Sequence, residues 1–476
     1  MGDDRARLVA FLGAVIAAGA ILRLIPCFGD FWLDEIWSYY YARELTSPIE
    51  VFTNVHHSNN HHLPMLWLYA LGDVPYWVYR IPSLLAGIGS VALAAYLGWR
   101  RGRVEAVFVT VLFGFSFLLV AYSSEARGYA CALFFALLSW VALDLYLARG
   151  GWRHGVWFVT AVVLGYLSQL VFLLFYASLM IWGIARVFGR RRAMPDPGGA
   201  RLDSLLAWQA IPIAAFLALY WVDLRHMEVG SGESLAWTVV AGQTIGHLFG
   251  TPAALGGLQA GCALLLLTLG IRLLARRGDD SWILVLAGTI APVLVIALAR
   301  PDVVAPRYFI LAGALLLWIA GLLLASLYRR GGIARAASLG AMALFLAGHG
   351  SYLAGFLEHG RGGYHEAMRY MAAHTRGPQL VVGLDHEFRT GIVLRFYARS
   401  VPEKEILVAT DESWPAEGPE WFVAHRPENP DHVAAQVADR FGNAYRLEAA
   451  YPFAGLSGFH WALYRSLRDV PESQIE

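Results

Sequence analysis

The sequence predicts a polytopic α-helical membrane protein with a small C-terminal α/β domain. The chain of 476 residues is 57% hydrophobic and 15% charged, whereas soluble domains usually carry about 25% charged residues. Apolar runs of about 20 residues, long enough to cross a hydrocarbon core of about 30 Å, recur as far as residue 357. Polar residues then become more frequent, and no further apolar run of this length follows.

Eleven segments are apolar and long enough to be predicted as spans. Only Ser168-Gln169 divides the fifth from the sixth, and the segment 62–73 is too short to cross, so we expect a re-entrant or interfacial helix there. The first span is predicted to be uncleaved, because residues 1–7 are mixed in charge and no clear cleavage site follows the apolar run. The predicted spans are 8–25, 80–99, 104–121, 127–148, 153–167, 169–187, 204–222, 255–275, 281–299, 307–327 and 333–357.

Arginines are concentrated in every second loop, and the positive-inside rule makes these loops cytoplasmic. The N-terminus is then inside, whereas the loops 26–79 and 223–254, the turns 122–126 and 300–306, and the tail after 357 lie outside. An odd number of spans agrees with this arrangement. The arginines concerned are Arg100, Arg101, Arg103, Arg149, Arg153, Arg190, Arg191, Arg192, Arg201, Arg272, Arg276, Arg277, Arg329, Arg330 and Arg335.

The tail alternates between helical and strand patterns, which predicts a small α/β domain over 359–476, after a membrane domain over 1–358. It contains neither a Gly-rich phosphate loop nor a metal-binding spacing. The predicted elements are a helix at Tyr364–Thr375, strands at Gln379–Leu384 and Ile406–Thr410, a helix at Pro430–Phe441 and a strand at His460–Ser466.

Overall charge and cysteine content exclude several classes of function. The formal net charge of +1 predicts no nucleic-acid partner. The cysteines Cys27, Cys131 and Cys262 match neither a zinc spacing nor a disulfide framework. Span interiors carry almost no charge, although transporters place charged groups there to build ion paths.

Two adjacent carboxylates, Asp34 and Glu35, follow the first span by about ten residues, among aromatic side chains that favour the membrane–water interface. A carboxylate there is suited to act as a general base on a substrate that arrives through the lipid. The alternative, less favoured for Asp34, is a solvated loop carboxylate or a helix cap, and for Glu35 the two interpretations are evenly balanced.

Histidines and arginines occur on the same predicted side of the membrane. His56, His57, His61 and His62 could bind a metal, but their spacing matches no zinc motif, and an interfacial polar turn is the favoured interpretation. Arg127 and Arg307 could each bind a phosphate through bidentate hydrogen bonds from the guanidinium group. They could instead anchor span ends at the lipid head groups, as could Arg80.

The motif Leu33-Asp34-Glu35 after the first span resembles the first-loop signature of GT-C glycosyltransferases, polytopic enzymes that use polyprenyl-phosphate sugar donors. The resemblance extends over roughly residues 8–330, and five motifs occur in order on one predicted side. It is strongest to the branch of protein O-mannosyltransferases, aminoarabinose transferases and lipopolysaccharide galacturonosyltransferases. The further motifs are Asn60-His61-His62-Leu63-Pro64, Arg80-Ile81-Pro82-Ser83, Ser124-Glu125-Ala126-Arg127-Gly128-Tyr129 and Pro306-Arg307-Tyr308.

The resemblance implies roles for these residues. Asp34 would be the catalytic base, Glu35 would support it, and Arg127, Arg307 and Arg80 would bind the donor phosphate. Many relatives have two prolines where this chain has Leu63-Pro64, and the loop 26–79 lacks the lysine of some relatives, which leaves its histidines as candidates to compensate. Candidates for acceptor binding or loop structure are His57, Asn60, His61, His62, Glu125 and Tyr308.

The implied function is transfer of a sugar, with inversion, from a polyprenyl-phosphate donor to a hydroxyl acceptor on a glycan, lipid or protein. We expect the enzyme in the plasma membrane of the cell envelope, with its active site and C-terminal domain outside, in contact with membrane lipids. No cofactor is assigned, although some GT-C enzymes need a divalent metal. The alternatives are a polysaccharide ligase that uses a pyrophosphate-linked lipid, and a non-catalytic transporter or flippase of lipid-linked sugars.

Overall fold

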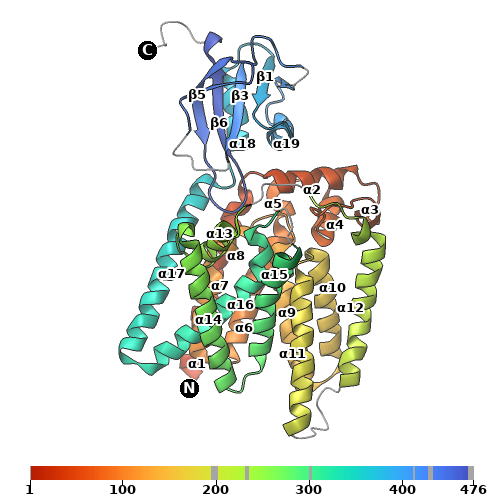
Figure 1. Cartoon of the computed structure of the whole chain (residues 1–476), viewed down its shortest axis with the longest axis vertical. Coiled ribbons are helices and arrows are strands. Elements are labelled where there is room, and N and C mark those ends of the chain that lie inside the picture. The colour runs from red at the N-terminus through yellow and green to blue at the C-terminus, as the bar shows by residue number, and fades with distance from the viewer. Residues whose placement is uncertain are drawn as a thin grey trace. The chain divides into compact units, whose positions relative to one another are not determined.

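The computed structural model describes residues 2–193, 202–230, 235–299, 303–410, 413–426 and 433–469. The chain forms two compact units (Figure 1). The helical unit comprises Met1–Cys27 and Tyr41–Tyr352, and the C-terminal unit comprises Phe28–Tyr40 and Leu353–Glu476. The first-loop segment Phe28–Tyr40 therefore groups with the C-terminal residues, a grouping that the sequence does not indicate.

Long helices build the helical unit, and the short helices α3, α4 and α5 lie together at one of its ends (Figure 1). The α helices are α1 (Gly2–Leu24), α3 (Glu50–Thr53), α4 (His62–Leu71), α5 (Tyr76–Tyr79), α6 (Ile81–Trp99), α7 (Arg103–Phe115), α8 (Phe117–Ser123), α9 (Tyr129–Arg149), α10 (Trp152–Ser168), α11 (Phe172–Ala193), α12 (Leu202–Val222), α13 (Trp237–Phe249), α14 (Gly256–Arg276), α15 (Ser281–Ala299), α16 (Ile310–Arg330) and α17 (Gly332–His359), which continues into the C-terminal unit. The 3₁₀ turns are η1 (Ile25–Phe28), η2 (Leu224–His226), η3 (Ala253–Leu255) and η4 (Pro306–Phe309).

Among the described residues, fewer helices meet the length and composition of a span than the eleven predicted. Within the described residues, 9 helices are long and apolar enough to cross a membrane, or 10 if the bent pair α7 and α8 forms one span. Each of the eleven predicted segments is helical, and α10, which is not among the nine, has 17 residues, at the lower limit of the length that crosses a bilayer. The segment predicted as a short interfacial or re-entrant helix is α4, with 10 residues.

The break between α7 and α8 has an identifiable cause. The two helices differ in direction by 56°. At the break, the Phe117 N–H donates to His349 Nδ1 at 3.0 Å, and the Ser116 hydroxyl donates to the Leu248 carbonyl at 3.1 Å. Side chains that take over helical backbone partners bend helices in this way.

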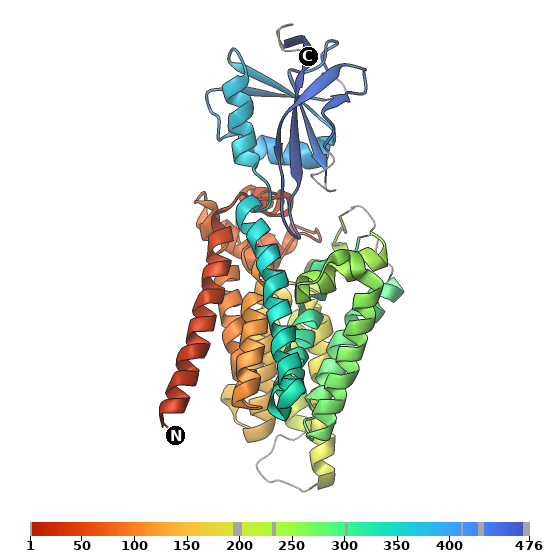
Figure 2. The same cartoon turned by 90° about the vertical axis from the view of Figure 1, so that its left-hand side faces the viewer.

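The helices α9 and α16 form the core of the helical unit. Most of their residues are buried, whereas α1, α12, α14 and α17 expose most of theirs, and α1 lies at one edge (Figure 2). Trp140 of α9 and Trp318 of α16 meet edge to face, with ring centroids 4.9 Å apart. The outer helices expose large apolar side chains such as Leu264 and Leu298, which suits a lipid environment.

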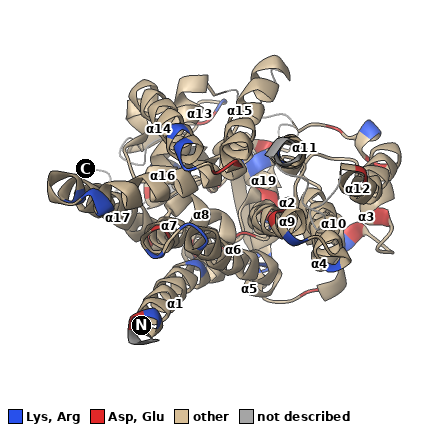
Figure 3. Ribbon diagram, turned by 90° about the horizontal axis from the view of Figure 1, so that it is seen from below, with Lys and Arg blue, Asp and Glu red and all other residues tan. Residues whose placement is uncertain are grey.

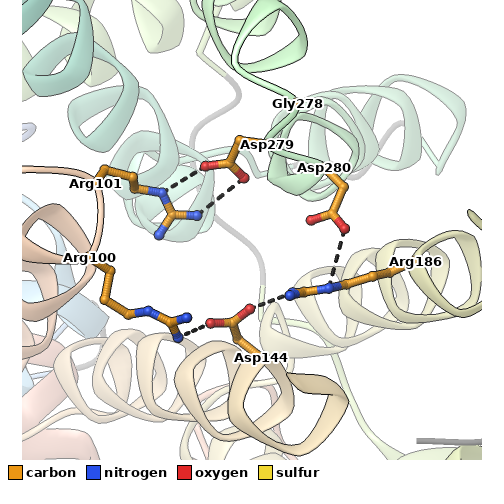
Figure 4. Close-up of a pocket in the computed structure, with 7 residues that line it drawn as sticks. All are labelled: Arg100, Arg101, Asp144, Arg186, Gly278, Asp279 and Asp280. Carbon is orange, nitrogen blue, oxygen red and sulfur yellow. Dashed lines mark hydrogen bonds and ion pairs between the residues drawn. The ribbon is translucent and has the colours of Figure 1, made fainter. Parts of the chain in front are cut away.

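One end of the helical unit carries a polar cavity of about 380 Å³. Asp144 accepts hydrogen bonds from both Arg100 and Arg186, and Arg101 Nε lies 2.9 Å from Asp279 Oδ2 (Figure 4). We call these side chains, together with Asp280, the arginine–aspartate cluster. Charged residues also lie on α1, α14 and α17, but most of the helical ribbon carries none (Figure 3). The cluster joins four segments, the turn after α6, the ends of α9 and α11 and the turn between α14 and α15, and each of them adjoins or contains an arginine-rich loop predicted to be cytoplasmic.

Replacement of Asp144 by asparagine is expected to destabilise the helical unit. Asparagine keeps the size of the side chain but removes the charge that Arg100 and Arg186 share. The groups are mostly buried, so we expect a loss of about 1–3 kcal/mol, between the values for exposed and buried ion pairs. Thermal unfolding in detergent measures it. The exposed Asp203→Asn is the control, and equal melting of both variants would contradict the prediction.

The C-terminal unit contains a mixed sheet whose strand order, within the described residues, is β2-β1-β3-β6-β5-β4. The strand β1 pairs in parallel with both β2 and β3, and the remaining pairs are antiparallel. Its core includes Tyr445 and Tyr464. The elements are α18 (Tyr364–His374), β1 (Gln379–Leu384), α19 (Glu387–Ala398), β2 (Glu405–Ala409), β3 (Trp421–Arg426), β4 (Gln436–Ala438), β5 (Ala444–Tyr451), β6 (His460–Ser466) and the 3₁₀ turn η6 (Leu467–Asp469).

The sequence predicted part of this unit correctly. The helix α18 and the strands β1, β2 and β6 are confirmed to within one residue at each end. The predicted helix over Pro430–Phe441 is wrong where the chain is described, because Gln436–Ala438 pairs as an edge strand with β5, and residues 430–432 lie outside the described residues. Pairing with a neighbouring strand decides the structure of so short a segment, whatever its local pattern.

Candidate functional site

The carboxylates of the first loop lie at the start of α2 (Leu33–Glu44), in the part of this helix that belongs to the C-terminal unit. Glu35 is fully buried, and its Oε2 accepts from the Trp32 N–H at 3.4 Å, as the glutamate of a capping box does. Asp34, one residue earlier, is half-buried. Glu35 therefore has a structural role in starting α2, whereas Asp34 is the more accessible carboxylate.

Two hydrogen bonds, among other contacts, hold the same segment within the C-terminal unit. Asp30 Oδ2 accepts from the His365 N–H at 2.8 Å, at the start of α18. The Tyr397 hydroxyl donates to the Phe31 carbonyl at 3.0 Å. These hydrogen bonds fix the residues that precede Asp34, so the backbone at the start of α2 has a defined position within this unit.

In the helical unit, Arg127 precedes α9 and is buried. Its Nη1 donates to Asn59 Oδ1 at 2.7 Å, and its carbonyl accepts from the Ser83 hydroxyl at 2.8 Å. Gly128 is required here because a Cβ atom would lie 1.7 Å from the carbonyl oxygen of Ser168. The start of α9 thus packs directly against the end of α10, and the guanidinium of Arg127 is held in one orientation.

His61 lies against this arginine. Its Nδ1 accepts from the Gly128 N–H at 2.8 Å, and its Nε2 lies 3.3 Å from Arg127 Nη2. Burial, followed by the positive charges of Arg127 and Arg307, holds the pKa of the His61 imidazole well below its usual range. A cation is disfavoured beside two guanidinium groups, so His61 is neutral near pH 7.

Arg307 lies in η4, the turn before α16, and its charge acts on the same imidazole as that of Arg127. The guanidinium carbon of Arg307 lies 5.7 Å from the ring centroid of the neighbouring Tyr308. Two arginines from segments 180 positions apart in the sequence therefore act on one buried histidine. We call Arg127, Arg307 and His61 the arginine–histidine centre.

A buried aspartate holds the histidine loop. Asp223, directly after α12, bonds His56 Nδ1 through Oδ1 at 2.6 Å and His62 Nε2 through Oδ2 at 2.5 Å. Backbone hydrogen bonds between residues 56–58 and Glu228 extend this contact. His62 is thus engaged in holding its loop to the end of α12, which supports the polar-turn interpretation. Within the described residues, no group of three or more His, Cys, Asp or Glu side chains could hold a metal ion.

The remaining candidates have local partners. Arg80 Nη1 donates to the Cys27 carbonyl at 2.8 Å, and Asn60 Nδ2 donates to the Val51 and Val55 carbonyls. His57 Nδ1 accepts from the Asn59 N–H at 3.0 Å. Glu125 is buried in the turn before Arg127. Arg80, Asn60 and His57 therefore make contacts that support the backbone around the arginine–histidine centre.

Two residues near this centre were not predicted. Gln169 lies between α10 and α11, with its Nε2 3.4 Å from His61 Nε2. Asp223 contacts histidines that lie more than 160 positions away in the sequence. The sequence offered one signal for each residue. Gln169 is a polar residue between two apolar helices, and Asp223 is an aspartate at the end of an apolar span. Neither signal indicates which histidine the side chain contacts in the folded protein.

An apolar cavity of about 310 Å³ lies among α13, α14, α15 and α16. Its lining includes Phe309, two residues after Arg307, together with Trp237, Leu264 and Leu316. The walls are almost entirely hydrocarbon or aromatic. This geometry suits an acyl or prenyl chain whose polar end lies near Arg307.

Comparison with solved structures defines the class of fold. No protein-family model and no curated protein sequence matches the chain. The chain has an ArnT-like fold. It is similar to crystal structures of ArnT from Cupriavidus metallidurans bound to undecaprenyl phosphate (TM-score 0.51, 13% identity, covering 98% of this chain and 100% of ArnT) and in the apo state (TM-score 0.52, 12% identity, covering 96% and 98%). The resemblance drawn from the five sequence motifs is confirmed at the level of the fold.

Proposed function

We propose that this protein is a membrane glycosyltransferase that moves a sugar from a polyprenyl-phosphate donor to a hydroxyl acceptor. The observation that carries the proposal is the arginine–histidine centre, in which buried Arg127 lies 3.3 Å from His61 and the positive charge of Arg307 lowers the pKa of the same imidazole. The apolar cavity beginning at Phe309 supports it, because a prenyl chain there would bring its phosphate toward Arg307. The ArnT-like fold adds further support, since one of the similar structures is bound to undecaprenyl phosphate.

In the proposed reaction, Asp34 takes the proton of the acceptor hydroxyl as general base. The acceptor oxygen forms a bond to the anomeric carbon of the sugar from the face opposite the phosphate, so the configuration inverts. The bond between the anomeric carbon and the phosphate oxygen breaks, and its electron pair stays on the phosphate. Arg127 and Arg307 stabilise the charge that develops on this leaving group, and Glu35 maintains the helix start that holds Asp34.

A second candidate is a ligase that takes its glycan from a pyrophosphate-linked lipid. Two guanidinium groups can also bind a pyrophosphate, so the donor decides between the two functions. We expect proteoliposomes containing the protein to release polyprenyl monophosphate from a radiolabelled polyprenyl-monophosphate sugar when acceptor is added. Turnover of only the pyrophosphate-linked donor would favour the ligase, and turnover of neither donor would contradict both candidates.

The proposed reaction takes place on the extracytoplasmic side of the plasma membrane, where we also place the tail after residue 357. The arginine-bearing segments gathered at the arginine–aspartate cluster support this orientation through the positive-inside rule. We expect an impermeant thiol reagent to label Glu420→Cys and Ser58→Cys, in a cysteine-free background, from outside intact cells. A cysteine at Arg103 should be labelled only after permeabilisation. Labelling of positions 58 and 420 from opposite sides would contradict both the topology and the mechanism.

A further inference from the structure

The hydrogen bond at one nitrogen of His61 fixes where its proton lies. A neutral imidazole has one donor nitrogen and one acceptor nitrogen. The acceptor is Nδ1, because it receives the Gly128 backbone N–H at 2.8 Å. The proton of the neutral ring is therefore on Nε2, the nitrogen that faces Arg127 and Gln169.

The orientation of the Gln169 amide is fixed in a similar way. Its Oε1 accepts from the Val171 N–H at 3.0 Å, at the start of α11. A flipped amide would place its NH₂ group against that N–H, which excludes the flip. The Gln169 NH₂ group therefore points toward His61 Nε2, with the two nitrogens 3.4 Å apart.

Three hydrogen-bond donors thus meet at one place. His61 Nε2 presents an N–H, the Gln169 amide presents an NH₂ group, and Arg127 Nη2, at 3.3 Å from His61 Nε2, can only donate. All three side chains are more than nine-tenths buried, at 6%, 8% and 3% exposure. The His61 and Gln169 donors face one another in a buried site, and an acceptor with several lone pairs within reach of both would satisfy them.

We propose that His61 and Gln169 are anion-binding residues that, together with Arg127, bind a phosphate oxygen through uncharged N–H groups. The inference rests on the proposed function and extends it to two residues that supply hydrogen bonds without adding charge. With Arg127 and Arg307 as the two positive charges, the site matches a leaving phosphate whose charge rises from −1 in the sugar diester to about −2 in the released monoester. This design stabilises the product of bond cleavage more than the bound donor.

Replacement of Gln169 by glutamate tests the proposal, because the new carboxylate would itself accept from His61 and Arg127. We expect Gln169→Glu to melt at or above the wild-type temperature without ligand and to bind undecaprenyl phosphate at least about tenfold more weakly. The probes are inorganic phosphate and undecaprenyl phosphate, added to the full chain in detergent. Their affinities follow from the ligand-induced rise in melting temperature.

Gln259→Glu is the matched control. Gln259 is equally buried, at 5% exposure, but its amide donates to Thr251 Oγ1 and the Pro252 carbonyl, so a carboxylate there would face acceptors and lower the melting temperature. A second measurement does not depend on whether the variants fold. It is the ¹⁵N spectrum of wild-type protein labelled at histidine. His61, assigned by its loss in His61→Gln, should show a protonated Nε2 that shifts when inorganic phosphate is added.

The outcomes separate this inference from the proposed function. Binding of undecaprenyl phosphate by Gln169→Glu within threefold of wild type, or a His61 Nε2 signal unaffected by phosphate, would overturn the role of the uncharged donors and leave the proposed function standing. A wild-type protein stabilised by inorganic phosphate but not by undecaprenyl phosphate would support the anion site and contradict the polyprenyl donor. Stabilisation by neither probe would overturn both.

Discussion

Replacement of Asp34 by asparagine is expected to abolish sugar transfer while leaving the protein folded. Asparagine has nearly the same size as aspartate and keeps one oxygen acceptor, but it cannot take a proton from the acceptor hydroxyl. A general base typically contributes about 10²–10⁴-fold to the rate, so we expect a loss of this size in kcat. Because Asp34 is only half-buried, whereas the neighbouring cap is made by Glu35, the melting temperature should change little.

Glu35→Gln is the control for this prediction, because glutamine can still accept the Trp32 N–H that Glu35 accepts. We expect its transfer rate to stay within about tenfold of wild type, since the cap hydrogen bond of about 1 kcal/mol survives. The rates are measured by release of polyprenyl monophosphate in proteoliposomes. An Asp34→Asn variant within a few-fold of wild type would exclude Asp34 as the base. A Glu35→Gln variant as inactive as Asp34→Asn would move the role of base to Glu35.

The periodicity of apolar residues correctly predicted those helices and strands whose structure is decided by their own residues. The strand Gln379–Leu384 and the strand His460–Ser466 form with the predicted bounds, because each is apolar enough to lie in the sheet interior. The failure over Gln436–Ala438 has the opposite cause, since that segment is a strand only through its pairing with β5. The two counts of spans differ because hydropathy does not report that a helix bends, as between α7 and α8, or that it is as short as α10.

For the candidate site, the motifs predicted residue identities but not their partners. The sequence singled out Arg127, Arg307 and His61, and the structure places His61 against Arg127, with the charge of Arg307 also acting on its imidazole. It could not separate His61, at the arginines, from its neighbour His62, which bonds Asp223. Adjacent residues at the start of a helix point in different directions, so a one-residue difference decides between contact with Arg127 and contact with Asp223. The two histidines are told apart only in the folded protein, where Gln169 at the end of α10 lies against His61 and Asp223 at the end of α12 bonds His62.

Lysine substitution of Arg127 or Arg307 is expected to weaken donor use strongly without full loss. A guanidinium presents forked donors that match a phosphate, whereas an ammonium supplies a point charge with fewer directed donors. Arg127 also needs its planar group to reach Asn59 with one nitrogen while another faces His61. We expect about 10–100-fold lower kcat/KM for each lysine variant and a larger loss for alanine. Arg101→Lys, in the arginine–aspartate cluster at the opposite end of the bundle, is the control and should transfer normally.

The double variant decides whether the two arginines serve one phosphate. If each bound a separate group, the losses in transition-state free energy would add to within about 0.5 kcal/mol, as for independent sites. Residues that share one charged partner are not independent, because removal of one leaves the phosphate misplaced for the other. We therefore expect the combined loss in Arg127→Lys/Arg307→Lys to fall short of the sum of the single losses by about 1 kcal/mol or more. Strict additivity would show that Arg127 and Arg307, although both act on His61, do not hold the same leaving group.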